Sequence, residues 1–77
     1  MDIDKLAYMA NQIGDFFIAQ GDGAAAAILD HIKKFWDPRM RGAILEHLDE
    51  VSGDLRPAVL AALQTLKSQA KRKRSAA

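Results

Sequence analysis

The chain has 77 residues and a formal net charge of +1, and it contains no cysteine. A domain of this size buries only about 60% of the surface that its unfolded chain exposes, so we expect marginal stability. The lack of cysteine excludes disulfides and thiolate metal sites and favours a reducing compartment. No stretch reaches the roughly 20 apolar residues of a membrane span, and the acidic start MDID is unlike a signal peptide. We therefore expect a soluble, cytoplasmic protein.

Hydrophobic periodicity predicts an all-α fold, a small bundle of about four helices, since no segment alternates with the period of two typical of a strand. The first helix is expected to start at Asp2 or Asp4 and to end near Gln20. Gly21 and Gly23 follow, and glycine after the last turn is a common helix stop.

The second helix is predicted from Ala24 to Phe35, and a third begins at Pro38. The residue before a proline avoids the helical conformation, so Asp37 ends one helix. The same Asp is a good N-cap and Pro suits the first helical position, so this dipeptide also starts the next helix. Trp36 stands at the corner, where a buried indole with a hydrogen-bonded N–H would fix the angle between the helices.

The third helix is predicted to continue to about Val51. A fourth helix, capped by Asp54 and with Pro57 in its first turn, is expected to run to about Ser68. The short connections between these segments place successive helices side by side in a compact bundle.

Charge divides the chain into a helical domain, residues 1–68, and a basic tail, residues 69–77. Residues 1–66 hold six Lys/Arg against ten Asp/Glu, whereas residues 67–77 hold five Lys/Arg and no acid. The tail has no apolar period, so we expect it to be disordered. A folded nucleic-acid-binding protein usually carries its positive charge on the body, and this distribution weakens that interpretation.

The first helix carries more apolar surface than one core face requires. Its apolar residues spread over about 200° of a helical wheel, roughly twice the width of a core-facing stripe. The small residues Ala7, Ala10 and Gly14 would let another helix approach closely. We therefore predict that this helix, or the corner at Trp36, docks on another protein. The alternative is that the extra apolar residues are ordinary core and scattered surface positions.

Nine residues are candidates for partner contact. Arg39 and Arg41 are among them because cations in the first turn of a helix oppose its dipole, so helix stability does not explain them and an interfacial salt bridge would. The full set joins the first helix to the corner: Met9, Ile13, Phe16, Phe17, Trp36, Arg39, Met40, Arg41 and Leu45.

The sequence offers no pattern typical of a catalytic, metal or cofactor site. His31 and His47 are the only histidines, and they lie on different predicted helices without HxxxH or HExxH spacing, whereas zinc needs three or four ligands. Capping explains Asp37, and no glycine-rich phosphate loop follows a strand. We therefore expect a protein that is not itself an enzyme.

Several segments carry a family resemblance: MANQI at 9–13, Phe16 and Phe17, DHIKKFWDPRMR at 30–41, Ile44, His47 with Leu48 and, more weakly, LRPAV at 55–59. Together they resemble the delta subunit of the soluble NAD-dependent, molybdenum-containing formate dehydrogenases of bacteria, over about residues 5–63. The GDGAAAA segment at 21–27 and the basic tail depart from this pattern.

The resemblance implies a small accessory subunit of a cytoplasmic complex that oxidises formate and reduces NAD. It implies that molybdenum pterin, iron–sulfur clusters and FMN reside on the larger subunits, with none bound by this chain. It further implies docking on the large molybdenum-bearing alpha subunit, in support of assembly, cofactor insertion or stability, with other subunits of the complex as further partners.

Two other functions stay open from the residues. The chain could be a small helical nucleic-acid-binding protein that uses the third helix for recognition and the tail as an arm, although Glu46, Asp49 and Glu50 would repel phosphate. It could also be a self-associating module that buries the first helix in a symmetric dimer.

Overall fold

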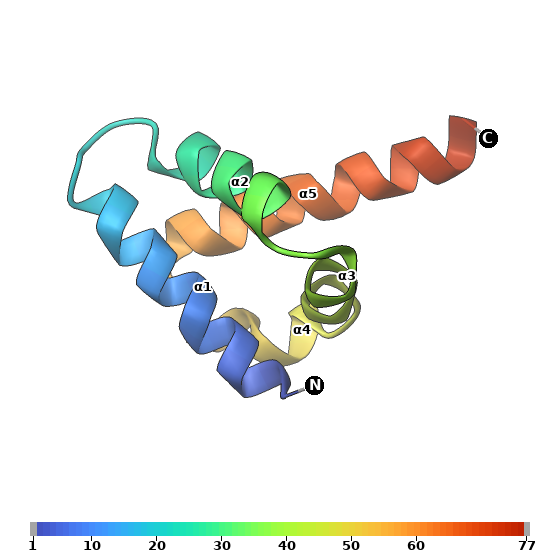
Figure 1. The fold of residues 1–77 in the computed structure, drawn as a ribbon, viewed down its shortest axis with the longest axis horizontal. Coiled ribbons are helices and arrows are strands. Elements are labelled where there is room, and N and C mark those ends of the chain that lie inside the picture. The colour runs from blue at the N-terminus through green and yellow to red at the C-terminus, as the bar shows by residue number, and fades with distance from the viewer. Residues whose placement is uncertain (1, 77) are drawn as a thin grey trace.

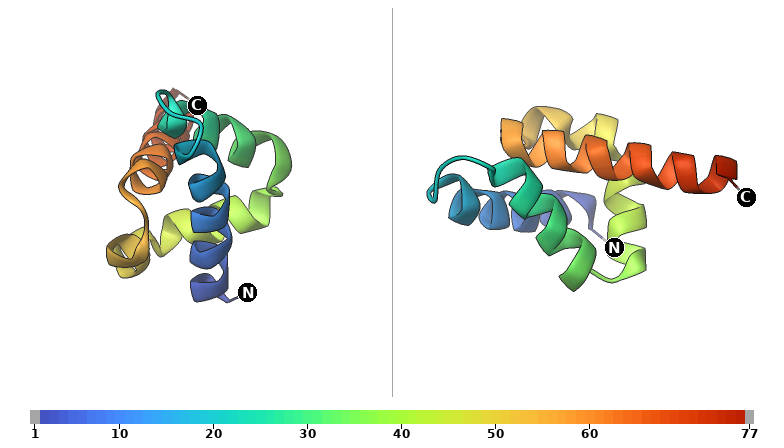
Figure 2. Two further views of the ribbon diagram at one scale, coloured as in Figure 1. Left: turned by 90° about the vertical axis from the view of Figure 1, so that its left-hand side faces the viewer. Right: turned by 90° about the horizontal axis from the view of Figure 1, so that it is seen from above.

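The computed structural model describes the backbone of residues 2–76 and the side chains of residues 2–72. Within this range the fold consists of helices without strands, which confirms the all-α prediction. The elements are α1 (Ile3–Ile18), α2 (Ala24–Phe35), α3 (Pro38–Glu46), α4 (Leu48–Val51), the 3₁₀ helix η1 (Ser52–Asp54) and α5 (Pro57–Ala76). α2 packs along the first half of α5, and α1 contacts both (Figure 1, Figure 2).

The ends of α1 follow the predicted capping chemistry. A carboxylate oxygen of Asp2 accepts the backbone N–H of Lys5 at 3.2 Å, which satisfies one of the free donors of the first turn. After Ile18 the chain turns through Gly21 and Gly23, whose φ angles are +104° and +85°. Only glycine adopts such angles without strain, so these two residues end one helix and lead into the next.

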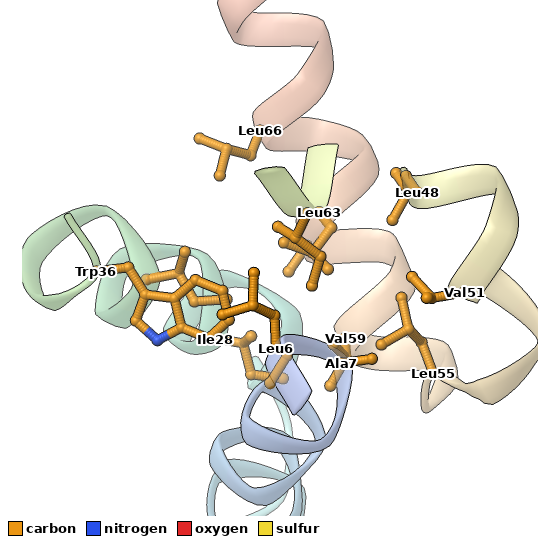
Figure 3. Close-up of a cluster of buried hydrophobic side chains, with 14 residues drawn as sticks. Leu6, Ala7, Ile28, Trp36, Leu48, Val51, Leu55, Val59, Leu63 and Leu66 are labelled. Carbon is orange, nitrogen blue, oxygen red and sulfur yellow. The ribbon is translucent and has the colours of Figure 1, made fainter. Parts of the chain in front are cut away.

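The corner between α2 and α3 is also built as predicted. Asp37 is the N-cap of α3 and its Oδ1 accepts the N–H of Met40 at 3.0 Å, while Pro38 occupies the first helical position. Trp36 has extended backbone angles, is 5% exposed and turns its ring toward the core (Figure 3).

One detail of the Trp36 prediction is wrong. The indole N–H makes no hydrogen bond with any described residue. Since no buried side-chain nitrogen or oxygen in this part of the chain lacks a partner, the N–H lies at the exposed edge of the ring. The indole therefore fixes the corner by packing alone.

The third predicted helix is not continuous. It breaks at His47, where φ is −108° and ψ is 19°, so that α3 and the short α4 replace a single helix to Val51. The break redirects the chain so that Val51 and Leu55 both enter the core. Tertiary packing thus overrides a helix that the local sequence would allow.

The predicted cap of the last helix is also wrong. Asp54 lies in η1, and its carbonyl oxygen accepts a hydrogen bond from Nδ2 of Asn11 at 2.8 Å. The Oδ1 atom of the same asparagine accepts the backbone N–H of Arg56 at 2.9 Å. Arg56 also donates from Nε to Oδ1 of Asp15 at 3.0 Å. α5 therefore begins where α1 holds the incoming chain by side-chain hydrogen bonds.

The helix α5 does not end near Ser68 but continues to Ala76. Residues 69–72 are Gln, Ala, Lys and Arg, all good helix formers, and neither glycine nor proline follows to stop the helix. The backbone of α5 thus runs on into the segment where the sequence predicts a disordered tail. The division of the chain into a domain at 1–68 and a tail at 69–77 stays a prediction.

The core is centred on the first half of α5 and draws on each of the α-helices (Figure 3). Its most deeply buried large side chains are Ile28, Ile32, Ile44, Val59 and Leu63. α1 contributes Leu6 and three small residues: Ala7, Ala10 and Gly14. These small residues therefore bring α1 close to the rest of its own chain, and the expectation that they receive a partner helix is wrong.

Gly14 provides the first test of this packing. A Cβ at Gly14 would overlap Cγ2 of Val59, so Gly14→Ala forces α1 and α5 apart. We expect the free energy of unfolding in urea to fall by about 1–2 kcal/mol, because overpacking outweighs the gain in helix propensity. Gly42→Ala is the matched control: a Cβ there meets no described atom within 4 Å, and a gain of about 0.5–1 kcal/mol is expected. Equal stability changes in the two variants would contradict this packing.

His47 at the helix break provides a second test. Its Nδ1 lies 3.0 Å from Oε1 of Glu50, and this hydrogen bond raises the pKa of His47 above its ordinary value of 6.5. A raised pKa in the folded state means that the interaction stabilises the fold below about pH 6.5 and is lost as pH rises through the folded value. In an NMR titration Glu50→Gln should lower the pKa of His47, and an unchanged value would disprove the interaction.

Candidate partner-binding surfaces

The nine predicted contact residues fall into three groups in the structure. Phe16 and Arg39 are exposed, whereas Trp36 is buried. The others are half-buried: Met9, Ile13, Phe17, Met40, Arg41 and Leu45. The apolar members of this last group pack against the edge of the core, and each leaves part of its side chain at the surface.

An aromatic face lies across α1 and α2 and consists of Phe16, Phe17, His31 and Phe35. The ring centroids of Phe16 and Phe17 are 5.1 Å apart, those of Phe17 and His31 5.8 Å, and those of His31 and Phe35 4.7 Å. The first two pairs meet edge to face, a favourable arrangement for aromatic rings. The four rings therefore form one continuous row rather than scattered apolar positions.

The two ends of this row are open to solvent. Phe16 is 62% exposed and Phe35 is 72% exposed, although residues of the same helices are fully buried. Between the rings lies a shallow hollow of about 290 Å³, lined by Gln12, Ile13, Phe16, Phe17 and His31. Tyr8, also exposed, accepts a hydrogen bond at its hydroxyl from Gln12 at 3.4 Å and extends the surface along α1. A contiguous exposed apolar patch of this kind marks an interaction site.

The sequence predicts the α1 half of the aromatic face but not the α2 half. Spacing alone makes His31 no more than a weak candidate for a metal ligand, and Phe35 is not among the nine predicted contact residues. The signal was present, because residues four apart lie on one side of a helix and an aromatic pair at that spacing can form an exposed strip. What could not be seen was that this strip meets Phe17 of α1.

The corner residues have roles within the chain. The buried Trp36 is not available for direct contact on this surface. A guanidinium nitrogen of Arg41 donates to the carbonyl oxygens of Lys33, at 3.1 Å, and of Trp36. These carbonyls belong to the end of α2, where acceptors lack helical partners. This cation in the first turn of α3 is thus explained by the neighbouring helix, whereas Arg39 makes no hydrogen bond or ion pair with the described residues.

A second hollow, here called the α3–α5 groove, has a volume of about 740 Å³. It includes Arg39 and Leu45 of the predicted contact set. The described residues that line it are Pro38, Arg39, Gly42, Ala43, Leu45, Glu46, Lys67, Ala70 and Lys71. No lining residue comes from α1 or α2, so the groove and the aromatic face are separate surfaces.

The described residues contain neither a metal-ligand cluster nor a membrane-spanning helix. No group of three or more His, Asp or Glu side chains gathers there in a way that could hold a metal ion. Nor does any helix among these residues combine the length and the apolar character that a membrane crossing requires.

Residues 5–63 match the family described as the NADH-dependent formate dehydrogenase delta subunit, FdsD. The chain belongs to this family. The matched segment is most of the chain, and it contains the whole aromatic face and the Trp36 corner. The α5 side of the α3–α5 groove, with Lys67, Ala70 and Lys71, lies beyond it. No curated protein and no solved structure matches the chain.

Membership of the FdsD family confirms the resemblance found in the sequence and makes the protein a formate dehydrogenase delta subunit by family. The partners of such a subunit are the other subunits of a formate dehydrogenase complex. An exposed apolar surface is therefore expected on this chain, since a small subunit must bury part of its own surface against the complex.

The different roles of the two arginines at the corner can be tested. Arg41→Met should lower the free energy of unfolding by about 1 kcal/mol, because the carbonyl oxygens at the end of α2 lose a charged donor. Arg39→Met, the control at a neighbouring exposed position, should change it by less than about 0.5 kcal/mol. Urea denaturation measures both values, and equal losses would contradict the assigned role of Arg41.

Proposed function

We propose that this delta subunit docks through its aromatic face on the large molybdenum-bearing alpha subunit of a cytoplasmic formate dehydrogenase. In this proposal the chain has no catalytic role of its own. It supports the assembly, cofactor insertion or stability of the subunit that carries out formate oxidation.

The observation that carries the proposal is the exposure of Phe16 and Phe35 at the two ends of one row of rings. Both helices of this row already supply buried residues to a closed core, so the exposed rings are not required for the chain to fold. Full burial of a Phe side chain contributes about 1.5–3 kcal/mol. Covering both rings with a partner would thus supply much of the free energy of a stable interface.

The shape of the aromatic face fits this role. At its centre lies a shallow hollow with apolar walls. The side chains of Gln12 and His31 add polar groups to the lining of this hollow. Interfaces of stable complexes commonly combine such an apolar centre, rich in aromatic anchors, with a polar edge. A projecting apolar side chain of the alpha subunit would fill the hollow between Ile13 and Phe17.

The same proposal places molybdenum pterin, the iron–sulfur clusters and FMN on the partner subunits. The residues of this chain do not fit an iron–sulfur cluster. Iron–sulfur clusters are held mainly by cysteine thiolates, and the chain has no cysteine. Its two histidines lie on opposite sides of the α2–α3 corner, each beside a different partner: His31 beside aromatic rings and His47 beside Glu50.

Substitution of the two exposed rings tests the proposal. The double variant Phe16→Gln/Phe35→Gln, co-expressed with the other subunits, should bind the complex at least about 30-fold more weakly, because two anchors are removed. Co-purification with the alpha subunit and formate-dependent NAD reduction should fall together. The melting temperature of the isolated chain should stay within a few degrees of the unmodified protein, since both side chains are exposed.

Ala61→Gln is the matched control, because it places the same side chain at an exposed position of α5 away from the aromatic face. It should leave co-purification unchanged. Normal yields of the complex with the double variant would refute the proposal. Loss of self-association of the isolated chain, without loss of complex, would assign the aromatic face to a dimer instead.

A further inference from the structure

We infer that the α3–α5 groove is a second docking site, and that its occupant is an acidic amphipathic helix of a partner protein. The groove shares no residue with the aromatic face. The inference therefore goes beyond the proposed function and does not depend on it.

The shape and lining of the groove suit a helical occupant. Its lining residues come from α3 on one side and from the second half of α5 on the other, so both walls are helical. Leu45, Ala43 and Ala70 give the groove apolar surface. A hollow of about 740 Å³ between two helices is the usual receptor for a third helix, which inserts its apolar side chains between them.

The positive charge of the groove lining points to an acidic occupant. The lining includes the cations Arg39, Lys67 and Lys71 and only one acid, Glu46. Arg39 and Lys67 make no hydrogen bond or ion pair within the described part of the chain. The body of the protein carries an excess of acid, so this positive surface is a local departure from its average. An occupant that brings carboxylates would complement it.

Gly42 on the α3 wall also points to an occupant. Glycine inside a helix costs about 1 kcal/mol relative to alanine. No contact among the described residues requires it, because Gly42 lies in regular helix, is exposed, and a Cβ there would meet no described atom of another element within 4 Å. Gly14, by contrast, is required by Val59. The absence of a side chain at Gly42 leaves room for the backbone of an occupant to come close to α3.

Gly42 also makes the inference testable without unfolding the protein. Gly42→Lys and Gly42→Glu place side chains of similar length at the same open position, with opposite charge. The probe is a fluorescent synthetic peptide of about 14 residues, or four helical turns, with leucines on one face and glutamates on the others. A second probe has lysines in place of the glutamates.

Fluorescence anisotropy on the full chain should show that the acidic probe binds and that the lysine probe binds at least about tenfold more weakly. Both Gly42 variants should bind the acidic probe more weakly than the unmodified chain, because each new side chain fills the space left at Gly42. Gly42→Glu should show the larger loss, at least about tenfold, because its charge also repels the acidic probe. Binding should weaken as NaCl rises from about 50 to about 300 mM. NMR amide shifts should map to α3 and to residues 67–71.

The Phe16→Gln/Phe35→Gln variant separates this inference from the proposed function, and it should bind the acidic probe as tightly as the unmodified chain. Any of four results would overturn the inference: no binding of the acidic probe, equal binding of both probes, an affinity of Gly42→Glu equal to that of the unmodified chain, or amide shifts confined to the aromatic face. Tighter binding of a DNA duplex than of the acidic peptide would also overturn it and assign the groove to phosphate.

Discussion

The close approach of α1 to α5 at Gly14 and Val59 is the constraint on which the rest of the structure depends. Two helices whose facing positions carry small side chains pack close together, and Gly14 contributes no side chain at all to this contact. Asn11 and Asp15, on the same helix, bind the chain as it enters α5. α1 thereby fixes both the position and the starting point of the helix around which the core is built.

This contact also explains why large rings are left outside. Because Ala7, Ala10 and Gly14 close most of the core side of α1, its bulky side chains other than Leu6 lie at the flank or in solvent, and Phe16 is mainly exposed. α2 lies beside α1, and its His31 and Phe35 continue the row begun by Phe16 and Phe17. The aromatic face is thus a direct consequence of the difference in side-chain size between the two sides of α1. A delta subunit gains from it a surface that can be covered without opening its own core.

The residues of the α2–α3 corner mainly stabilise the fold and contribute little exposed surface. Trp36 packs into the core and Arg41 binds the last carbonyls of α2, so both residues hold the angle from which α3 projects. That angle sets α3 opposite the second half of α5 and creates the α3–α5 groove. A substitution at Trp36 would therefore alter stability and the groove together, whereas substitutions at Phe16, Phe35 or Gly42 act on one surface at a time.

The sequence by itself determined the helical class, the bounds of α2, the Asp37–Pro38 corner and the family, because capping residues, proline and helical periodicity act over a few neighbouring positions. It missed the break at His47, misplaced the start and the end of α5, and assigned Ala7, Ala10 and Gly14 to a partner. Apart from the end of α5, those features were decided by contacts between residues far apart in sequence, such as Asn11 with Arg56 and Gly14 with Val59. A wheel shows how wide an apolar arc is, but only the packed chain decides which part of that arc the core covers.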